Sequence, residues 1–170
     1  MFEKKIPPAR FERLMTDPRF RSRLLVLNII TVAFFSAPVA YAGLIASGVL
    51  SGEGGAVSEF PIWWVLAAIA VMQVPALFIG GFAILRQAER EDTFGKAFER
   101  GQMALVLALA LGESVCIFGV VASALGSPAG VAYGFLLFGV VLMGVSLIVF
   151  RPKAIAIAVL KLLEEEKTSG

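Results

Sequence analysis

Four long stretches of this chain contain almost no charged residues. They cover residues 24–50, 60–85, 102–125 and 129–150, and the one Asp, Glu, Lys or Arg within them is Glu113. Crossing the roughly 30 Å hydrocarbon core of a bilayer takes about 20 helical residues. A lone segment satisfies its backbone hydrogen bonds in lipid by forming a helix. The sequence therefore predicts an all-α integral membrane protein, a bundle of four transmembrane helices.

The composition of the chain is that of a membrane protein, and we expect no separate soluble domain. Hydrophobic residues make up 58% of the 170-residue chain and charged residues 16%, against about 25% charged in a typical soluble domain. We expect a basic cytoplasmic or interfacial segment at 1–23, the membrane bundle at 24–150, and a cytoplasmic helical tail at 151–170. With no histidine, one cysteine and no recognisable catalytic motif, we expect no metal site, no cofactor and no enzymatic activity.

The positive charges indicate how the chain threads through the membrane. Seven of the fifteen Lys and Arg residues precede Leu24, four lie in 86–100, and four follow from Arg151 onward. The connections 51–59 and 126–128 have none. With four spans, all three basic groups share one side, which the positive-inside rule places in the cytoplasm. We expect a bacterial inner (plasma) membrane protein with both termini cytoplasmic. Thirteen acids balance these scattered bases, which disfavours a nucleic-acid partner.

Glu113 is the residue of the spans that most needs an explanation. It lies eleven residues after Gln102, which is about 17 Å along a helix and near the midplane. An ionised acid there costs at least a few kcal/mol, so we expect a neutral carboxyl that ionises when it meets water or a cation. Such a group can carry an ion. It can equally be a structural hydrogen-bond donor worth about 1 kcal/mol, and the residues alone leave both interpretations open.

Other polar or small residues fall at the same depth. Gln73 in the second span is almost level with Glu113, and we expect it to donate a hydrogen bond to the carboxyl if the second and third helices pack together. Ser36 lies near this level in the first span, and Phe138 and Gly139 occupy it in the fourth. The spacing therefore predicts a polar layer at the midplane.

Small residues recur at four-residue spacing in the third and fourth spans. Such rows allow helix backbones to approach closely in lipid. The residues that we expect to form packing surfaces are Ala104, Ala108, Gly112, Cys116, Gly119, Gly130 and Gly134. Because glycine is common in membrane helices, a packing role is favoured over a ligand role.

The stretch GESVCIFGVVASAL around Glu113 resembles the carboxylate helix of the ion-carrying c subunits (proteolipids) of rotary ATPases. In that family a small residue and a Glu are followed by an aromatic residue, a Gly and a run of Val, Leu, Ile and Ala. The matching residues are Gly112, Glu113, Ile117, Phe118, Gly119, Val120, Val121 and Ala122. The similarity covers about residues 60–125, where Arg86 and Gln87 resemble the polar turn of the family's cytoplasmic loop.

The resemblance implies that Glu113 binds H⁺ or Na⁺ and that Gln73 is a polar partner in the ion site. It further implies ion transport by a lipid-embedded protein that forms a homo-oligomer or assembles with other membrane subunits. The alternative is a structural or assembly subunit of a membrane complex, in which Glu113 serves as a packing hydrogen-bond donor.

Overall fold

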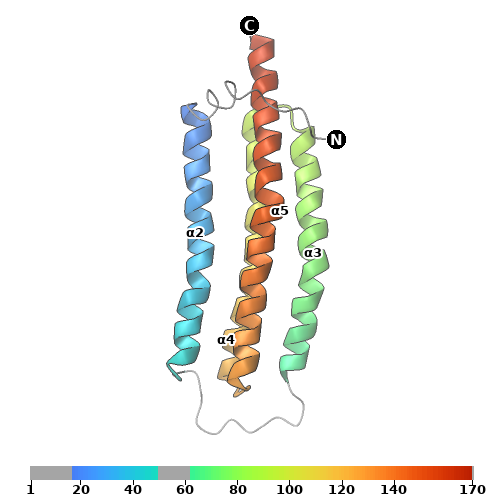
Figure 1. Ribbon diagram of the computed structural model, residues 1–170. Helices are drawn as coiled ribbons and strands as arrows, with labels where there is room; N and C mark the ends of the chain where they lie inside the picture. The colour runs from blue at the N-terminus through green and yellow to red at the C-terminus, as the bar shows by residue number, and fades with distance from the viewer. Residues whose placement is uncertain (1–16, 50–61, 170) are drawn as a thin grey trace.

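The computed structural model describes residues 17–49 and 62–169, and the regular secondary structure in these ranges is entirely α-helical (Figure 1). The helices are α2 (Pro18–Ala46), α3 (Ile62–Arg90), α4 (Phe94–Ala124) and α5 (Ala129–Ser169). All four are long and apolar enough to cross a membrane. This confirms the predicted all-α class, and the protein is a small multi-pass membrane protein.

All four helices extend beyond one end of the apolar stretch that predicted them, and α2 begins six residues before Leu24. α3 continues past Leu85 to Arg90, α4 begins eight residues before Gln102, and α5 continues to Ser169. The added turns are rich in Glu, Lys, Arg and Ala, which are good helix formers. The helices therefore continue after the hydrophobic pattern has ended. Residues 1–16 of the predicted basic segment, and the connection 51–59, lie outside the described residues.

Local signals determine two of the helix ends. α2 begins at Pro18, a residue suited to the first helical position because no backbone N–H is needed there. The Asp17 carboxylate accepts a 2.7 Å hydrogen bond from the backbone N–H of Arg19, which satisfies one of the unpaired donors of the first turn. After α4, Gly126 adopts a φ of 75°, a left-handed conformation that glycine tolerates. The resulting tight turn makes α4 and α5 antiparallel neighbours.

α4 and α5 form a closely packed pair at the centre of the bundle, with α2 and α3 on either side (Figure 1). The outer helices contact this pair far more than each other. Among the 18 most apolar consecutive residues of each helix, 44% are buried in α4 and 39% in α5, whereas 11% are buried in α2 and 11% in α3. The outer helices thus leave most of their apolar surface to lipid or to partner subunits.

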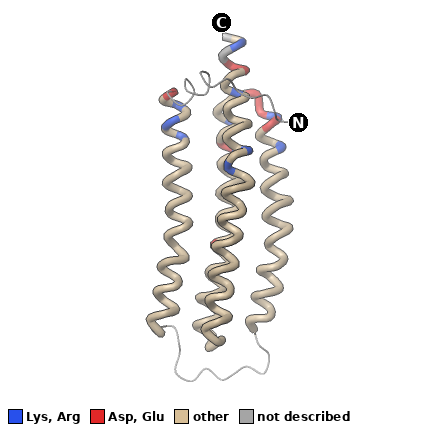
Figure 2. The backbone as a smooth tube through the Cα atoms, viewed as in Figure 1, with Lys and Arg blue, Asp and Glu red and all other residues tan. Residues whose placement is uncertain are grey.

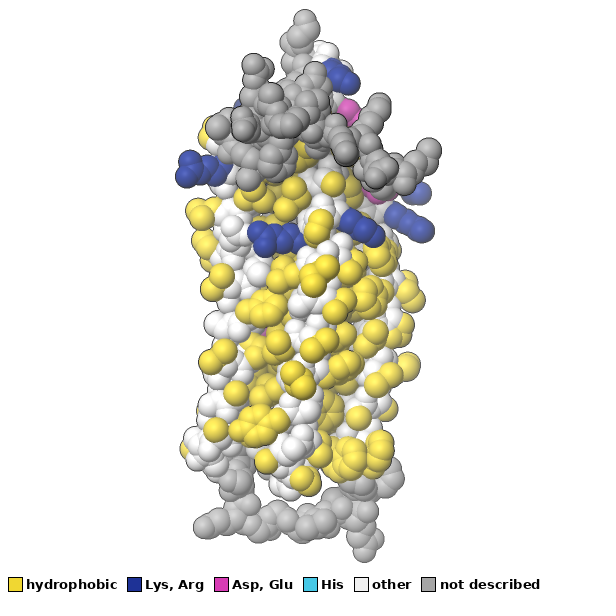
Figure 3. All heavy atoms as spheres, viewed as in Figure 1, with side chains coloured by type: hydrophobic (Ala, Val, Ile, Leu, Met, Phe, Trp, Pro, Cys, Tyr) yellow, Lys and Arg dark blue, Asp and Glu magenta, His cyan; other side chains and the backbone are white. Residues whose placement is uncertain are grey.

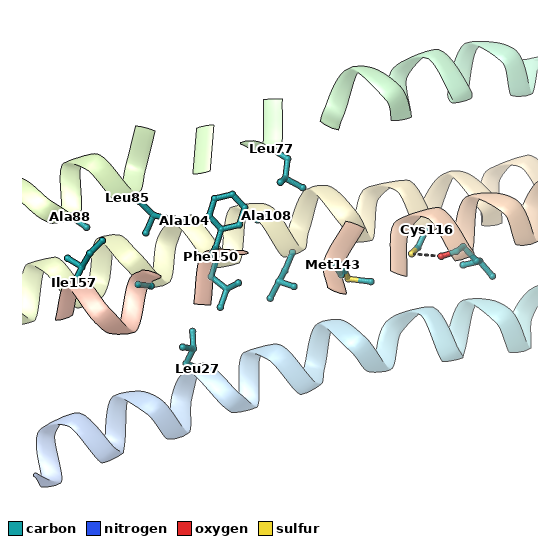
Figure 4. Close-up of a cluster of buried hydrophobic side chains, with 14 of the residues drawn as sticks. Leu27, Leu77, Leu85, Ala88, Ala104, Ala108, Cys116, Met143, Phe150 and Ile157 are labelled. Atoms are coloured by element: carbon teal, nitrogen blue, oxygen red, sulfur yellow. Dashed lines mark hydrogen bonds between the residues drawn. The ribbon is translucent and has the colours of Figure 1, made fainter. Parts of the chain in front are cut away.

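Small residues bring α4 and α5 together along a contact that we call the α4–α5 seam, made of Gly112, Cys116 and Gly139 and continued by Ala104 and Ala108. Figure 4 shows Ala104, Ala108 and Cys116 of this seam. A Cβ on Gly112 would lie 3.2 Å from the Gly139 carbonyl oxygen, and a Cβ on Gly139 would lie 2.9 Å from the Cys116 backbone nitrogen. Ala104 and Ala108 are fully buried. In lipid, where the hydrophobic force between helices is absent, such van der Waals contact stabilises the pair.

Not every residue expected at a packing surface lies in this seam. Gly119 does pack closely, against the Ala132 carbonyl of α5. In contrast, Gly130 and Gly134 are exposed, and a Cβ added to either would have no heavy atom of the described residues within 4 Å. α5 approaches the middle of α4 through Gly139 instead. Among the residues that the structure describes, Gly130 and Gly134 therefore pack against no other helix.

Charged residues gather at the end of the bundle where α2 begins and α5 ends (Figure 2). Contacts between helices hold this charged end together. Arg23 Nη1 donates a 2.9 Å hydrogen bond to the Gly95 carbonyl. Glu165 Oε1 accepts a 2.6 Å bond from the backbone N–H of Phe94 and so caps the start of α4 from another helix. The placement of this end in the cytoplasm stays a prediction of the positive-inside rule.

Replacing Gly139 with Leu should disrupt the seam, because the new side chain would meet the backbones of Gly112 and Cys116. We expect the free energy of unfolding to fall by about 1–3 kcal/mol, measured by steric trapping in bicelles. Gly134→Leu is the matched control, since it adds the same side chain to open space on the same helix. Equal losses in the two variants would contradict the seam.

Candidate functional site

Glu113 lies on α4 with its carboxyl turned toward α2. Its Oε1 accepts a 3.1 Å hydrogen bond from the hydroxyl of Tyr41, and its side chain is half-buried. It is eleven residues from Gln102 and eleven from the end of α4 at Ala124. The carboxyl is therefore at mid-height of the apolar part of α4, as its position in the sequence predicts.

The next residue, Ser114, faces α3. Its hydroxyl lies 2.9 Å from the side-chain oxygen of Gln73 and 2.8 Å from the Leu111 carbonyl oxygen of α4, and its one proton is shared between these two acceptors. Successive residues of an α-helix point about 100° apart, so Glu113 and Ser114 meet different neighbours. Gln73 lies at the predicted depth, but its partner is Ser114 rather than the Glu113 carboxyl. The two outer helices therefore each form one side-chain hydrogen bond with the middle of α4.

In α5 the residue that lies level with Glu113 is one that the sequence predicts, whereas in α2 the residue that contacts Glu113 is a different one from the residue predicted. Gly139 lies against Gly112 as its level predicts, whereas the Ser36 hydroxyl donates to the Ala33 carbonyl of its own helix. Tyr41 supplies the contact instead, although its backbone lies five residues further along α2. Side chains on a helix lean toward its N-terminus, so the long tyrosine side chain reaches back toward the level of Ser36. The signal that could have identified this partner is the one tyrosine of an uncharged span, whose hydroxyl has a long reach.

Glu113 has no cationic neighbour in the part of the chain that the structure describes. The full sequence has no Lys, Arg or His from Leu24 to Leu85 or from Gln102 to Phe150. The ion pairs among the described residues all lie at the charged end. An ionised carboxylate at this depth would therefore lack a countercharge among the described residues, and lipid makes an unpaired charge costly.

No group of three His, Cys, Asp or Glu side chains in residues 17–49 and 62–169 is placed to hold a metal ion. Cys116 is fully buried in the seam, where its thiol donates a 3.6 Å hydrogen bond to the Leu136 carbonyl (Figure 4). Cys116 is thus a small core residue.

The side of α4 opposite α5 is open, because α2 and α3 flank α4 without closing over it. Met103, Ala110 and Ile117 repeat on this side at seven-residue spacing and are exposed. We call them the open α4 strip. Glu113 borders the strip on the α2 side, and Ser114 borders it on the α3 side. A partner that covered the strip would therefore lie next to the carboxyl.

Comparison with known protein families, with curated proteins and with solved structures finds no match for this chain. The similarity to the c subunits of rotary ATPases therefore stays a prediction, based on the motif around Glu113.

A double-mutant cycle can test the two polar pairs. We expect Tyr41→Phe and Glu113→Leu to be coupled by about 0.5–2 kcal/mol in the free energy of unfolding, because they remove the same hydrogen bond. Tyr41→Phe and Gln73→Leu should instead be additive within about 0.5 kcal/mol, since they act on different pairs. Additivity in the first cycle combined with strong coupling in the second would contradict the assigned partners.

Proposed function

We propose that this protein is a c-subunit-like membrane protein that binds a proton reversibly at Glu113. The observation that supports this role is a half-buried carboxyl at mid-height of the bundle that is paired with the Tyr41 hydroxyl and has no cation beside it. Lipid favours the neutral form of such a group. The group becomes charged when water or a basic partner reaches it. A site that changes charge in this way can take up a proton from one surface and release it at another.

Tyr41 contributes to both forms of the site. In the protonated acid, one carboxyl oxygen accepts the Tyr41 hydrogen bond at 3.1 Å, while the other oxygen carries the proton. After release, the same hydrogen bond becomes charge-assisted and roughly twice as strong. Tyr41 can therefore stay hydrogen-bonded to Glu113 in both forms, and it supplies no permanent countercharge. A hydrogen bond that can form with both the protonated and the ionised carboxyl is compatible with reversible binding of a proton at Glu113.

A proton suits the site better than Na⁺. Hard metal cations in proteins take about six oxygen ligands. Among the described residues, the Glu113 carboxyl accepts a hydrogen bond from one side-chain hydroxyl, that of Tyr41. The Ser114 and Gln73 oxygens, which could have added ligands, are bonded to each other on the α3 side.

The partner in proton exchange is proposed to contact the open α4 strip. Either a second copy of this chain or another membrane subunit would bring a helix beside Glu113 there. With the charged end in the cytoplasm of a bacterial inner membrane, the site would lie midway between the two aqueous phases. Proton movement would then depend on how the partner exposes the carboxyl to each side.

Infrared difference spectroscopy in bilayers tests the binding step. We expect the wild-type protein to show a protonated carboxylic acid band that disappears reversibly as the pH is raised, and we expect Glu113→Gln to lack it. Glu89→Gln is the matched control, because Glu89 is an exposed acid on α3 outside the apolar stretch. A band that persists in Glu113→Gln, or that never titrates in the wild type, would contradict the proposal.

A bulky substitution on the open α4 strip tests whether partner subunits contact the protein there. Ile117→Trp should lower the native mass of the gently extracted protein, because it obstructs the surface beside Glu113. Ile148→Trp is the control, since Ile148 is 76% exposed on α5, away from the strip. A monomeric wild-type protein, or assemblies that persist equally in both variants, would rule out the strip as the contact surface.

The second candidate is a structural or assembly subunit, and the pairing of the outer helices favours it. α2 and α3 bury little surface, and each gains one mid-membrane hydrogen bond to α4. In that role Glu113→Gln would be tolerated, because the amide still accepts a hydrogen bond from Tyr41. Loss of function with intact assembly in Glu113→Gln separates proton binding from this alternative.

A further inference from the structure

A groove lies between α3 and α5 at the border between their apolar stretches and the charged end. It has a volume of about 450 Å³, within the roughly 300–1,000 Å³ typical of small-molecule sites. Its walls are mainly apolar and include Phe82 and Leu85 from α3 and Ala156 and Ile157 from α5. These walls offer an apolar ligand a continuous surface.

Two cations stand at the rim of this groove. Arg86 and Lys153 both line it and are both exposed. Within the described part of the chain, neither is in an ion pair. Lys153 Nζ lies 4.3 Å from the centroid of the Phe82 ring, which places the ammonium over the apolar wall. Glu89 is the one acid among the lining residues, so the lining carries a net positive charge.

The groove crosses the level at which a bilayer changes from hydrocarbon to headgroups. On α3 the apolar run ends at Leu85 and is followed at once by Arg86, and on α5 it ends at Phe150 and is followed by Arg151. Lys and Arg side chains form a band at this level above a largely hydrophobic surface (Figure 3). The rim at Arg86 and Lys153 is therefore suited to a phosphate, and the apolar surface at Phe82, on the hydrocarbon side of Arg86, is suited to an acyl chain.

We propose that this groove binds one anionic phospholipid. The phosphate lies between Arg86 and Lys153, where the planar guanidinium can form two parallel hydrogen bonds and the ammonium supplies a point charge. One acyl chain runs along the apolar walls between α3 and α5. Basic pockets between transmembrane helices bind anionic headgroups in this way. This site is separate from Glu113 and does not depend on proton binding.

Native mass spectrometry of the full chain, titrated with phosphatidylglycerol or phosphatidylcholine, tests the charged half of the site. Each cation near a membrane surface strengthens the binding of an anionic lipid by about fivefold. We therefore expect the wild type to bind phosphatidylglycerol at least tenfold more tightly than phosphatidylcholine. In the double variant Arg86→Gln/Lys153→Gln, this preference should fall to about twofold or less.

The matched control is Arg21→Gln/Lys96→Gln, which removes two exposed cations from the same end of the bundle outside the groove. It should keep the wild-type preference. Equal loss in both double variants would overturn the proposal, since it would mean that the lipid responds to the overall charge of this end. Equal binding of the two lipids by the wild type would overturn it too.

The apolar half of the site needs its own variant. Ala156→Trp places an indole in the groove and leaves both cations unchanged, so it should weaken phosphatidylglycerol binding at least tenfold. Glycerol 3-phosphate, which has the headgroup chemistry and no acyl chain, should not compete with the lipid. Competition by glycerol 3-phosphate, or full lipid binding by Ala156→Trp, would show that the cations hold a free phosphate ester and would overturn the acyl-chain assignment.

Discussion

The close contact between α4 and α5 determines how the functional candidates are oriented. Gly112 and Cys116 are turned into α5, and successive residues on a helix point about 100° apart. Glu113 is therefore turned toward α2, and Ser114 toward α3. If Gly139 were larger, the helices would have to separate or rotate, and both hydrogen bonds would lose their geometry. The direction in which the Glu113 side chain points thus follows from the close approach of α4 and α5 that Gly112 and Gly139 allow.

This central pair also explains the uneven burial of the bundle. α4 and α5 bury much of their apolar surface against each other, and the outer helices bury little. α2 and α3 are held by a few hydrogen bonds at mid-height and at the charged end. Apolar faces are left open on the strip of α4 and in the groove between α3 and α5. In a bilayer such faces meet lipid or other helices. The open faces are suited to contact with lipid or with partner subunits, and the proposed proton exchange at Glu113 would use such a partner.

The fold could be predicted largely from hydropathy, whereas the partners in the site could not. Apolar length identified four spans, and rise per residue placed Glu113, Gln73 and Gly139 at their observed depths. Depth alone does not give the direction in which a side chain points. Gln73 was therefore assigned to Glu113, although it meets Ser114, and Tyr41 was missed because its side chain reaches more than a turn back along α2. The direction in which each side chain points depends on the rotation of α4 about its axis. The α4–α5 seam sets this rotation through contacts between residues that are far apart in the sequence, such as Gly112 and Gly139.

Solid-state NMR of the Glu113 carboxyl carbon in lipid bilayers at neutral pH tests the central claim most directly. We predict the chemical shift of a neutral carboxylic acid, together with a through-space contact to the ring of Tyr41. That result would establish a protonated acid in the membrane, held by the residue that the structure places beside it. An ionised carboxylate shift with no contact to Tyr41 would contradict both the protonation state and the orientation of α4 on which it depends.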